Sequence, residues 1–249
     1  MPVVYSYSYN KGLKKTKNED AINIAKNNDN NLISIICDGV SSHKNSSFSS
    51  NYIVKELTKK WKKSSFISYD NMKDWILDNI LLLNKEIINK SKKQNQKMAT
   101  TLLVTIIYED KILIINVGDS LSYGLTTDNK MKLLAKDDSF VGVLLDAGVI
   151  TAEEATIHPK RHTLTQAIGV DEDIEIHINE ESIENFDYIL NCSDGLTTML
   201  DDEEISNIII SEDLSNAVNM LIEKSNERGG VDNISISLFK ILRGVQDDR

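Results

Sequence analysis

The chain has 249 residues, a formal net charge of −10, and only 2 Pro and 11 Gly. No stretch approaches the ~20 consecutive apolar residues of a membrane span, and the N-terminal residues lack the charged start and apolar centre of a secretory signal. These features predict a cytoplasmic protein that makes no membrane contact. Because no Pro-rich or Gly/Ser-rich linker divides the chain, we expect residues 1–249 to form a single domain. No feature of the sequence indicates an oligomer interface, so we expect a monomer.

The charge is distributed unevenly along the chain. Residues 1–100 carry 17 Lys against 9 acidic residues, whereas the remainder carries 11 basic and 29 acidic residues. The lysines lie within helical patterns such as KELTKKWKK and KEIINKSKK, where a solvated helix face is the usual explanation. No zinc-finger or RNA-binding signature accompanies them, so the sequence does not predict nucleic acid as a partner.

Apolar alternation and short apolar runs predict strands, and apolar residues at helical spacing predict helices. The predicted strands lie at residues 3–9, 21–25, 32–37, 99–108, 111–117, 173–178, 187–193 and 233–242, with two more around a turn within 122–135. The predicted helices lie near residues 47–63, 70–92, 202–211 and 213–227. Residues 137–169 follow neither pattern for long and are interpreted as an excursion beside the ends of the strands.

The order of these elements predicts the fold class. Strands are followed by two helices, then strands, two more helices and a last strand, with none of the strand–helix alternation that a parallel sheet requires. We therefore expect an α+β fold, a four-layer α-β-β-α sandwich. Two mainly antiparallel sheets would pack face to face, with a pair of helices on each outer face.

Several of the predicted strands carry an acidic residue at one end. Three apolar runs end on an Asp with Gly beside it, and two other strands are preceded by acids. In an antiparallel sheet the end of one strand lies beside the start of its neighbour, so these acids can meet at one rim. Carboxylates that crowd together need a compensating cation, and oxygen ligands favour Mg²⁺ or Mn²⁺. The acids concerned are Glu19, Asp20, Asp38, Asp119, Asp194 and Asp232.

Structural explanations compete with this hypothesis. A single Asp beside Gly is more often a turn residue or a helix cap than a metal ligand. The recurrence at strand ends favours the metal site, because a sandwich can bring all of these ends together. The remaining residues with reactive or bulky side chains are interpreted as structural. Cys37 and Cys192 are read as small buried residues, Trp61 and Trp75 as core anchors, and His43, His158, His162 and His177 as surface or hydrogen-bonded residues.

Six segments occur in the order and approximate spacing of a known family. They are NED, CDGVSSH, ATTLLV, NVGDS, CSDGL and GGVDN. With them, the chain from about Lys11 to about Phe239 resembles the bacterial-type members of the PP2C (PPM) family, the metal-dependent Ser/Thr protein phosphatases. Any one segment is a weak signal, whereas six in order are a strong one. No GxSxG, P-loop or HExxH segment points to another chemistry.

The resemblance implies a function and its cofactors. It implies hydrolysis of phosphoserine and phosphothreonine in proteins by a metal-activated water, without a covalent phosphoenzyme. It further implies two Mn²⁺ or Mg²⁺ ions, with a third in bacterial-type members, and a phosphorylated protein, the target of a cognate Ser/Thr kinase, as partner. Residues 137–169 resemble the flap beside the family's active site.

The resemblance also assigns roles to residues. Asp38 corresponds to the carboxylate that bridges two ions, and Gly39 contributes its carbonyl to the second ion. Asp194 and Asp232 complete the protein ligands of the first ion, and Asp119 holds the third ion together with Asp194. Four residues form the implied catalytic set, and three form an outer set that supports the ligands or holds water. The catalytic set is Asp20, Asp38, Asp194 and Asp232, and the outer set is Glu19, Asp20 and Asn233.

The chain also departs from the family pattern. Lys15 stands where the family has a phosphate-binding Arg, and a Lys supplies charge without a bidentate fork. Val40 stands where some eukaryotic members place a His, and Asp138 where a His is common. Ser41 and Ser42 replace paired glycines. No departure removes an implied metal ligand.

Three hypotheses follow from the sequence. The first is an active metal-dependent protein phosphatase. The second is a catalytically weak relative that binds phosphorylated partners as a regulator, which the change at Lys15 suggests. The third is an ordinary metal-stabilised domain without phosphate chemistry. Metal-dependent hydrolysis of a phosphothreonine peptide separates the three.

Overall fold

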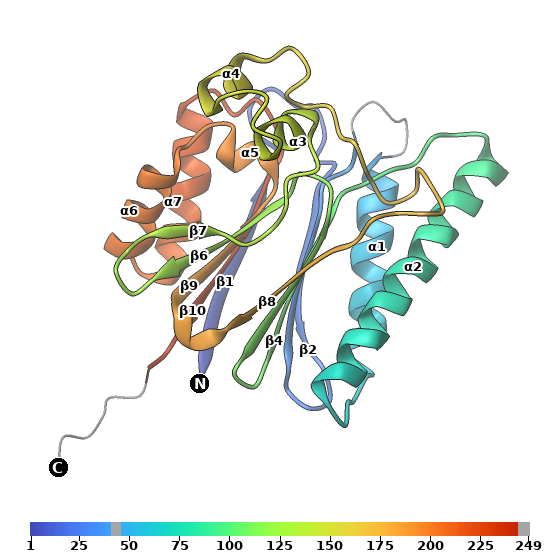
Figure 1. The fold of residues 1–249 in the computed structure, drawn as a ribbon, viewed down its shortest axis with the longest axis horizontal. Helices are drawn as coiled ribbons and strands as arrows, with labels where there is room; N and C mark the ends of the chain where they lie inside the picture. The colour runs from blue at the N-terminus through green and yellow to red at the C-terminus, as the bar shows by residue number, and fades with distance from the viewer. Residues whose placement is uncertain (41–45, 244–249) are drawn as a thin grey trace.

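The computed structural model describes residues 1–40 and 46–243, so the expectations for Ser41, Ser42 and His43 lie outside the described residues. The chain forms two five-stranded sheets whose neighbouring strands all pair antiparallel. The sheets pack face to face, and helices cover both outer faces (Figure 1). The predicted α+β sandwich is therefore confirmed.

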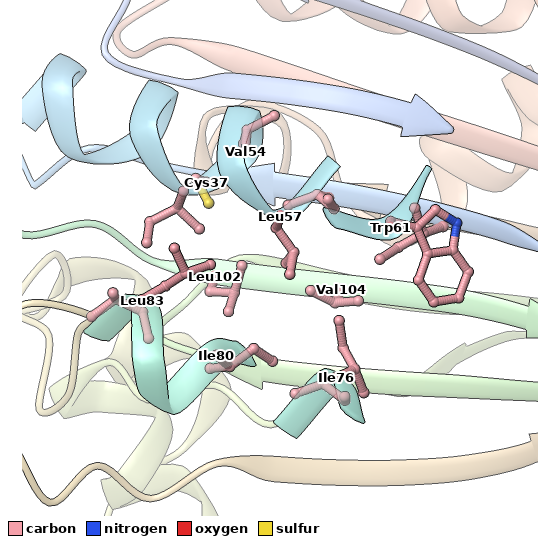
Figure 2. Packing of buried hydrophobic residues seen from close by; sticks show 14 of the residues in the cluster. Cys37, Val54, Leu57, Trp61, Ile76, Ile80, Leu83, Leu102 and Val104 are labelled. Carbon is pink, nitrogen blue, oxygen red and sulfur yellow. The ribbon is translucent and has the colours of Figure 1, made fainter. Parts of the chain in front are cut away.

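The first sheet has the strand order β2-β3-β4-β5-β8. Its strands are β2 (Ala21–Lys26), β3 (Leu32–Cys37), β4 (Leu102–Tyr108), β5 (Lys111–Val117) and β8 (His177–Ser182). Two helices cover its outer face, α1 (Ser46–Trp61) and α2 (Tyr69–Gln94). Figure 2 shows Leu57 of α1 and Ile80 of α2 meeting Val104 of β4, all at most 1% exposed. Trp61 is fully buried in this core and Trp75 packs against it, as predicted for both.

The second sheet has the strand order β1-β10-β9-β6-β7. Its strands are β1 (Val3–Asn10), β10 (Ile234–Ile241), β9 (Phe186–Cys192), β6 (Leu121–Thr126) and β7 (Met131–Leu133). Its outer face packs against a short helix, α5 (Asp194–Thr197), and the pair α6 (Asp202–Ser211) and α7 (Leu214–Glu227). Aspartates cap both longer helices, since Asp201 accepts a hydrogen bond from the Glu204 N–H and Asp213 accepts one from the Asn216 N–H.

Burial on both faces explains the unbroken apolar run of β3. Ile33 and Ile35 face the core beneath α1 and α2, whereas Leu32 and Ile36 face the layer between the two sheets. An antiparallel strand usually alternates between apolar and polar residues, but here neither face meets water. The two cysteines are free and fully buried, as predicted.

The differences from the predicted elements are local. The strand expected at 173–178 begins only at His177, although Ile174 and Ile176 still pack against the core of the first sheet. The short α5 was not predicted, because a helix of 4 residues leaves no periodic pattern. Residues 137–169 contain two short helices, α3 (Phe140–Asp146) and α4 (Ala152–Ile157), which lie at one end of the sandwich (Figure 1). Within the described part of the chain, no helix is both long and apolar enough for a membrane span.

Candidate active site

The predicted strand-end acids meet at the end of the sandwich where α3 and α4 lie. Asp38 directly follows β3, Asp194 opens α5 after β9, and Asp232 precedes β10. Together with Asp119, which lies in the turn after β5, they line one cavity of about 720 Å³. Antiparallel pairing places the end of β9 beside the start of β10, and the packing of the two sheets brings Asp194 and Asp232 to the same end of the sandwich as Asp38 and Asp119.

The electrostatics of this rim are unfavourable for carboxylates. Burial, followed by the charges of Asp20 and Asp194, raises the pKa of Asp38 well above its ordinary value. Burial and the charge of Asp194 raise the pKa of Asp119 in the same way. Burial raises the pKa of Asp20 to about 7, even though the Ser193 hydroxyl donates a 2.7 Å hydrogen bond to its Oδ2. The protein thus assembles acids that disfavour one another's charge.

The side chains at this rim are of the chemical type that binds divalent cations. They offer carboxylate oxygens, the ligands that Mg²⁺ and Mn²⁺ prefer, and the Oδ1 atom of Asp194 is buried without a hydrogen-bond partner in the described residues. As they stand, no three His, Cys, Asp or Glu side chains of residues 1–40 and 46–243 are gathered into a ready-made metal cluster. The acids line the walls of the cavity instead, with the cation Lys15 among them.

The backbone around Asp38 is held in place by threonines. The Asp38 N–H donates to the Thr101 hydroxyl at 2.9 Å, and the Asp38 carbonyl accepts from the Thr101 N–H and the Thr100 hydroxyl, both at 2.8 Å. At Gly39, a Cβ atom would lie 2.7 Å from the Ser46 carbonyl group, closer than real contacts allow. A glycine is therefore required where α1 begins against the end of β3.

Asn233 and Glu19 connect the rim to the segment before β2. The Asn233 side chain accepts a hydrogen bond from the Glu19 N–H at 2.8 Å and donates to the carbonyls of Lys11 and Lys17 at 2.8 and 3.1 Å. The Glu19 carboxylate pairs with Lys17 at 2.9 Å and accepts a hydrogen bond from the Ser46 hydroxyl. Asn233 thus fixes the loop that carries Lys15.

Lys15 lines the same cavity and is paired with one of its acids. Its Nζ atom is 2.7 Å from Asp232 Oδ1, and its side chain is 26% exposed. Burial lowers its pKa, but the hydrogen bond and charge of Asp232, together with Asp38 and Glu19, raise it more, so the pKa is raised overall. Lys15 is therefore held as a cation among the acids of the cavity.

Sequence reasoning missed two interactions that the fold creates. Asp138, 2% exposed, accepts a hydrogen bond from the Gly118 N–H at 3.0 Å and pairs with His177 Nε2 at 2.7 Å. Gly118 immediately precedes Asp119, so this buried pair supports the turn that presents that acid. Second, His162 lies with its Nδ1 atom 3.7 Å from Asp194 Oδ2. Neither contact has a spacing in the sequence that could have indicated it.

The 137–169 excursion forms one wall of the cavity. Its residues 162–167 line the cavity together with the acids. Asp138 ties this segment to the rim, because its carbonyl accepts hydrogen bonds from the N–H and the hydroxyl of Thr165, at 2.8 and 2.7 Å. A second tie runs from Thr100 to Ile168, whose backbones exchange hydrogen bonds at 3.1 and 2.9 Å.

Comparison with known proteins places the chain in a family. The family model for protein phosphatase 2C matches residues 13–233. A putative protein phosphatase 2C-type of Streptococcus pyogenes serotype M6 is 34% identical over 229 residues, covering 91% of this chain and 93% of that protein. The serine/threonine phosphatase stp of Listeria monocytogenes serotype 4b is 33% identical over 234 residues, covering 92% of each.

Solved structures agree with this placement. The crystal structure of the serine/threonine phosphatase Stp1 from Staphylococcus aureus matches with a TM-score of 0.93 and 27% identity, covering 98% of this chain and 96% of that one. The S. agalactiae serine/threonine phosphatase matches with a TM-score of 0.91 and 30% identity, covering 97% and 100%. The family match extends from the segment that carries Lys15 to Asn233, and so includes every predicted site residue. The chain therefore belongs to the protein phosphatase 2C family and is a protein phosphatase.

Proposed function

We propose that this chain hydrolyses phosphoserine and phosphothreonine in proteins with the help of Mn²⁺ or Mg²⁺. The observation that carries the proposal is the convergence of four strand-end aspartates and Lys15 on one cavity. The names of the relatives, serine/threonine phosphatases among them, support the substrate class. Because the substrate would be a phosphorylated protein, its partner in signalling would be a Ser/Thr kinase with the same target.

The proposed metal site uses the strand-end residues. Asp38, Asp194 and Asp232, with the Gly39 carbonyl, would hold two ions, and Asp119 with Asp194 would hold a third. When bound, such ions lower the pKa of water, neutralise phosphate charge and so allow direct attack by water on phosphorus without a protein nucleophile. Of the protein groups around them, Asp20 and Glu19 would accept hydrogen bonds from water in the cavity, and Asn233 would keep Glu19 in position.

Lys15 would bind the phosphate of the substrate. Its ammonium group is a point charge, so it attracts a dianionic monoester without the two parallel hydrogen bonds of an Arg. Its pair with Asp232 keeps it at the cavity wall. Replacing Lys15 by Arg should lower the KM for a phosphothreonine peptide several-fold and leave kcat nearly unchanged. An unchanged KM would contradict the proposed role of Lys15 in binding the phosphate.

We further propose that the chain acts in the cytoplasm as a monomeric, single-domain enzyme, with residues 137–169 as a flap over the cavity. The alternative of a catalytically weak phosphoprotein-binding regulator is less favoured. All four strand-end aspartates are in place, and the most similar relatives are named phosphatases. The change from Arg to Lys at position 15 alters a phosphate contact and not the metal site.

The test is metal-dependent release of phosphate from a phosphothreonine peptide. Wild-type protein with Mn²⁺ should turn the peptide over, and protein with a chelator should not. The double variant Asp38→Ala, Asp194→Ala should be inactive while its circular dichroism matches that of wild type. Turnover by the double variant equal to that of wild type would falsify the proposed site, and anomalous scattering from Mn²⁺-soaked crystals would count the ions.

A further inference from the structure

A second groove runs along the outside of the sandwich, apart from the catalytic cavity. It lies between α1 and the adjacent edges of the two sheets, β1 and β2, and has a volume of about 620 Å³. One end of it is formed by Asp20, the rim residue whose carboxylate bonds to Ser193. The other end is formed by Lys62 and Lys63, just beyond the last turn of α1.

The wall of the groove is strongly basic. Four exposed lysines line it, at positions that recur on one side of α1 and its extension. They are Lys55, Lys59, Lys62 and Lys63. The only acid within residues 55–63 is Glu56, which lies 3.8 Å from Lys59 Nζ. We refer to these four residues as the lysine wall.

Three residues of the lysine wall lack the acidic partner that several other lysines of the protein have. Lys73 pairs with Glu180, and Lys132 with Glu181. By contrast, Lys55, Lys62 and Lys63 form no ion pair with any residue in the described ranges 1–40 and 46–243. The whole chain has a net charge of −10, so the lysines give this groove a positive electrostatic potential on an otherwise acidic protein.

The floor of the groove can hold an extended peptide. Tyr9 is an aromatic residue that is 59% exposed, and Asn23 and Thr58 are joined by a 3.3 Å hydrogen bond. From Asn51 to the end of α1 at Trp61 the groove follows about 15 Å of helix, at ~1.5 Å per residue, and Lys62 and Lys63 extend it beyond the helix. An extended segment of about five to six residues, at ~3.3 Å each, spans the helix and this extension.

We propose that this groove binds an acidic segment of the protein substrate, a short extended stretch with several Asp or Glu side chains near the phosphorylated residue. The proposal rests on the proposed phosphatase function. Charge complementarity selects the segment, because carboxylates would pair with the lysine wall. The position of Asp20 at the end of the groove places such a segment beside the catalytic rim, so the same substrate chain can reach both.

The binding test uses a fluorescein-labelled peptide of six residues, four of them Glu or Asp, without phosphate and without metal. Anisotropy should show binding to wild type that weakens as salt is raised. The variant Lys55→Ala, Lys59→Ala, Lys62→Ala, Lys63→Ala should bind roughly tenfold or more weakly, since each exposed ion pair contributes modestly. A matched control removes four exposed lysines elsewhere. These are Lys85, Lys93, Lys136 and Lys240, which form no ion pair with any residue that the structure describes.

The activity test uses two phosphothreonine peptides that differ only in an acidic or a neutral flanking stretch. With the lysine wall removed, kcat/KM for the acidic peptide should fall to that for the neutral one, while turnover of p-nitrophenyl phosphate stays unchanged. If the control variant loses peptide binding equally, the groove is not the binding site of the acidic segment. If a single-stranded RNA oligonucleotide binds at the same lysines more tightly than the peptide, the proposed peptide ligand is wrong. The binding arm needs no turnover, so failure of hydrolysis on every substrate contradicts the phosphatase function and not the groove.

Discussion

Two sets of buried polar side chains lie within the same sandwich, and they differ in how they are satisfied. Between the sheets, the Ser34 and Ser237 hydroxyls lie 2.8 Å apart, the Thr105 hydroxyl donates to Asn191 Oδ1 at 2.7 Å, and the Asn191 amide donates to Ser237 at 3.0 Å. All of these residues are at most 1% exposed. These hydrogen bonds form one continuous network that joins the two sheets.

At the rim, the polar groups do not satisfy one another. Burial and the charges of neighbouring acids raise the pKa values of Asp38 and Asp119. The Oδ1 atom of Asp194 has no hydrogen-bond partner in the described residues. The same strand serves both sets. β3 contains Ser34 of the inter-sheet network and ends directly before Asp38 of the rim. Buried groups that pair with each other hold a fold together, whereas crowded acids that repel each other are arranged for a ligand.

The largest expected effect comes from Asp38→Asn, which removes one charge from the rim. Activity on a phosphothreonine peptide should fall by more than about a hundredfold, because loss of even the partners of metal ligands costs about 10–100-fold. Without divalent metal, however, the variant should be more stable than wild type by about 1 kcal/mol, since active sites commonly trade stability for function. Urea unfolding measures the second effect. Asp171→Asn, at an exposed aspartate, is the control, and a destabilised Asp38→Asn would contradict the repulsion argument.

Binding of a divalent metal should relieve the repulsion among the rim acids and stabilise the folded protein. Adding Mn²⁺ at about a hundred times its Kd should stabilise wild type by about 2.7 kcal/mol, because a ligand that binds only the folded state shifts the equilibrium by mass action. Asp38→Asn should gain much less at the same concentration. Urea midpoints with Mn²⁺ and with chelator give the comparison. Equal gains in both proteins would place the metal elsewhere.

The inter-sheet network should respond in the opposite way. Asn191→Ala leaves the Thr105 hydroxyl without its acceptor and should lower the free energy of unfolding by about 1–3 kcal/mol, while kcat per folded molecule stays near wild type. Replacing both partners, as Thr105→Val with Asn191→Leu, should recover part of that loss. A cycle of the single and double variants measures the coupling. If Asn191→Ala loses activity without losing stability, the two polar sets are not distinct.

Local signals explain what the sequence predicted. The run from Leu32 to Cys37 is apolar because both faces of β3 are buried, and its end at Asp38 and Gly39 is visible in the residue order. The helices α1 and α2 were predicted within about two residues at each end from the spacing of their apolar residues, which α1 and α2 bury. The meeting of the acids followed from the antiparallel order of the strands together with the packing of two sheets into a sandwich.

Contacts between distant segments could not be predicted. Lys15 and Asp232 lie near opposite ends of the chain. The pairing of β1 with β10, the hydrogen bonds of the Asn233 side chain and the backbone hydrogen bonds from residues 13 and 14 to the Gly230 carbonyl bring them together. Asp138 and His177 are separated by 39 residues, with the whole excursion between them. His177 has no metal-ligand spacing in the sequence, and its hydrogen bond to Asp138 agrees with the interpretation of the histidines as surface or hydrogen-bonded residues.

That pair sets the smallest expected effect. His177→Asn removes the 2.7 Å contact to Asp138, which supports Gly118 and hence the turn that carries Asp119. Because His177 acts through two intermediates, the apparent Mn²⁺ affinity should weaken by less than the about 10–100-fold typical of a direct partner of a metal ligand, and kcat at saturating Mn²⁺ should stay close to wild type. Calorimetric titration with Mn²⁺ separates this from general destabilisation, which would lower the active fraction without changing the affinity. The control is His158→Asn, at a half-buried histidine of residues 137–169 that does not line the cavity, and it should change neither quantity. Equal effects from both variants would mean that the Asp138 pair does not position the rim.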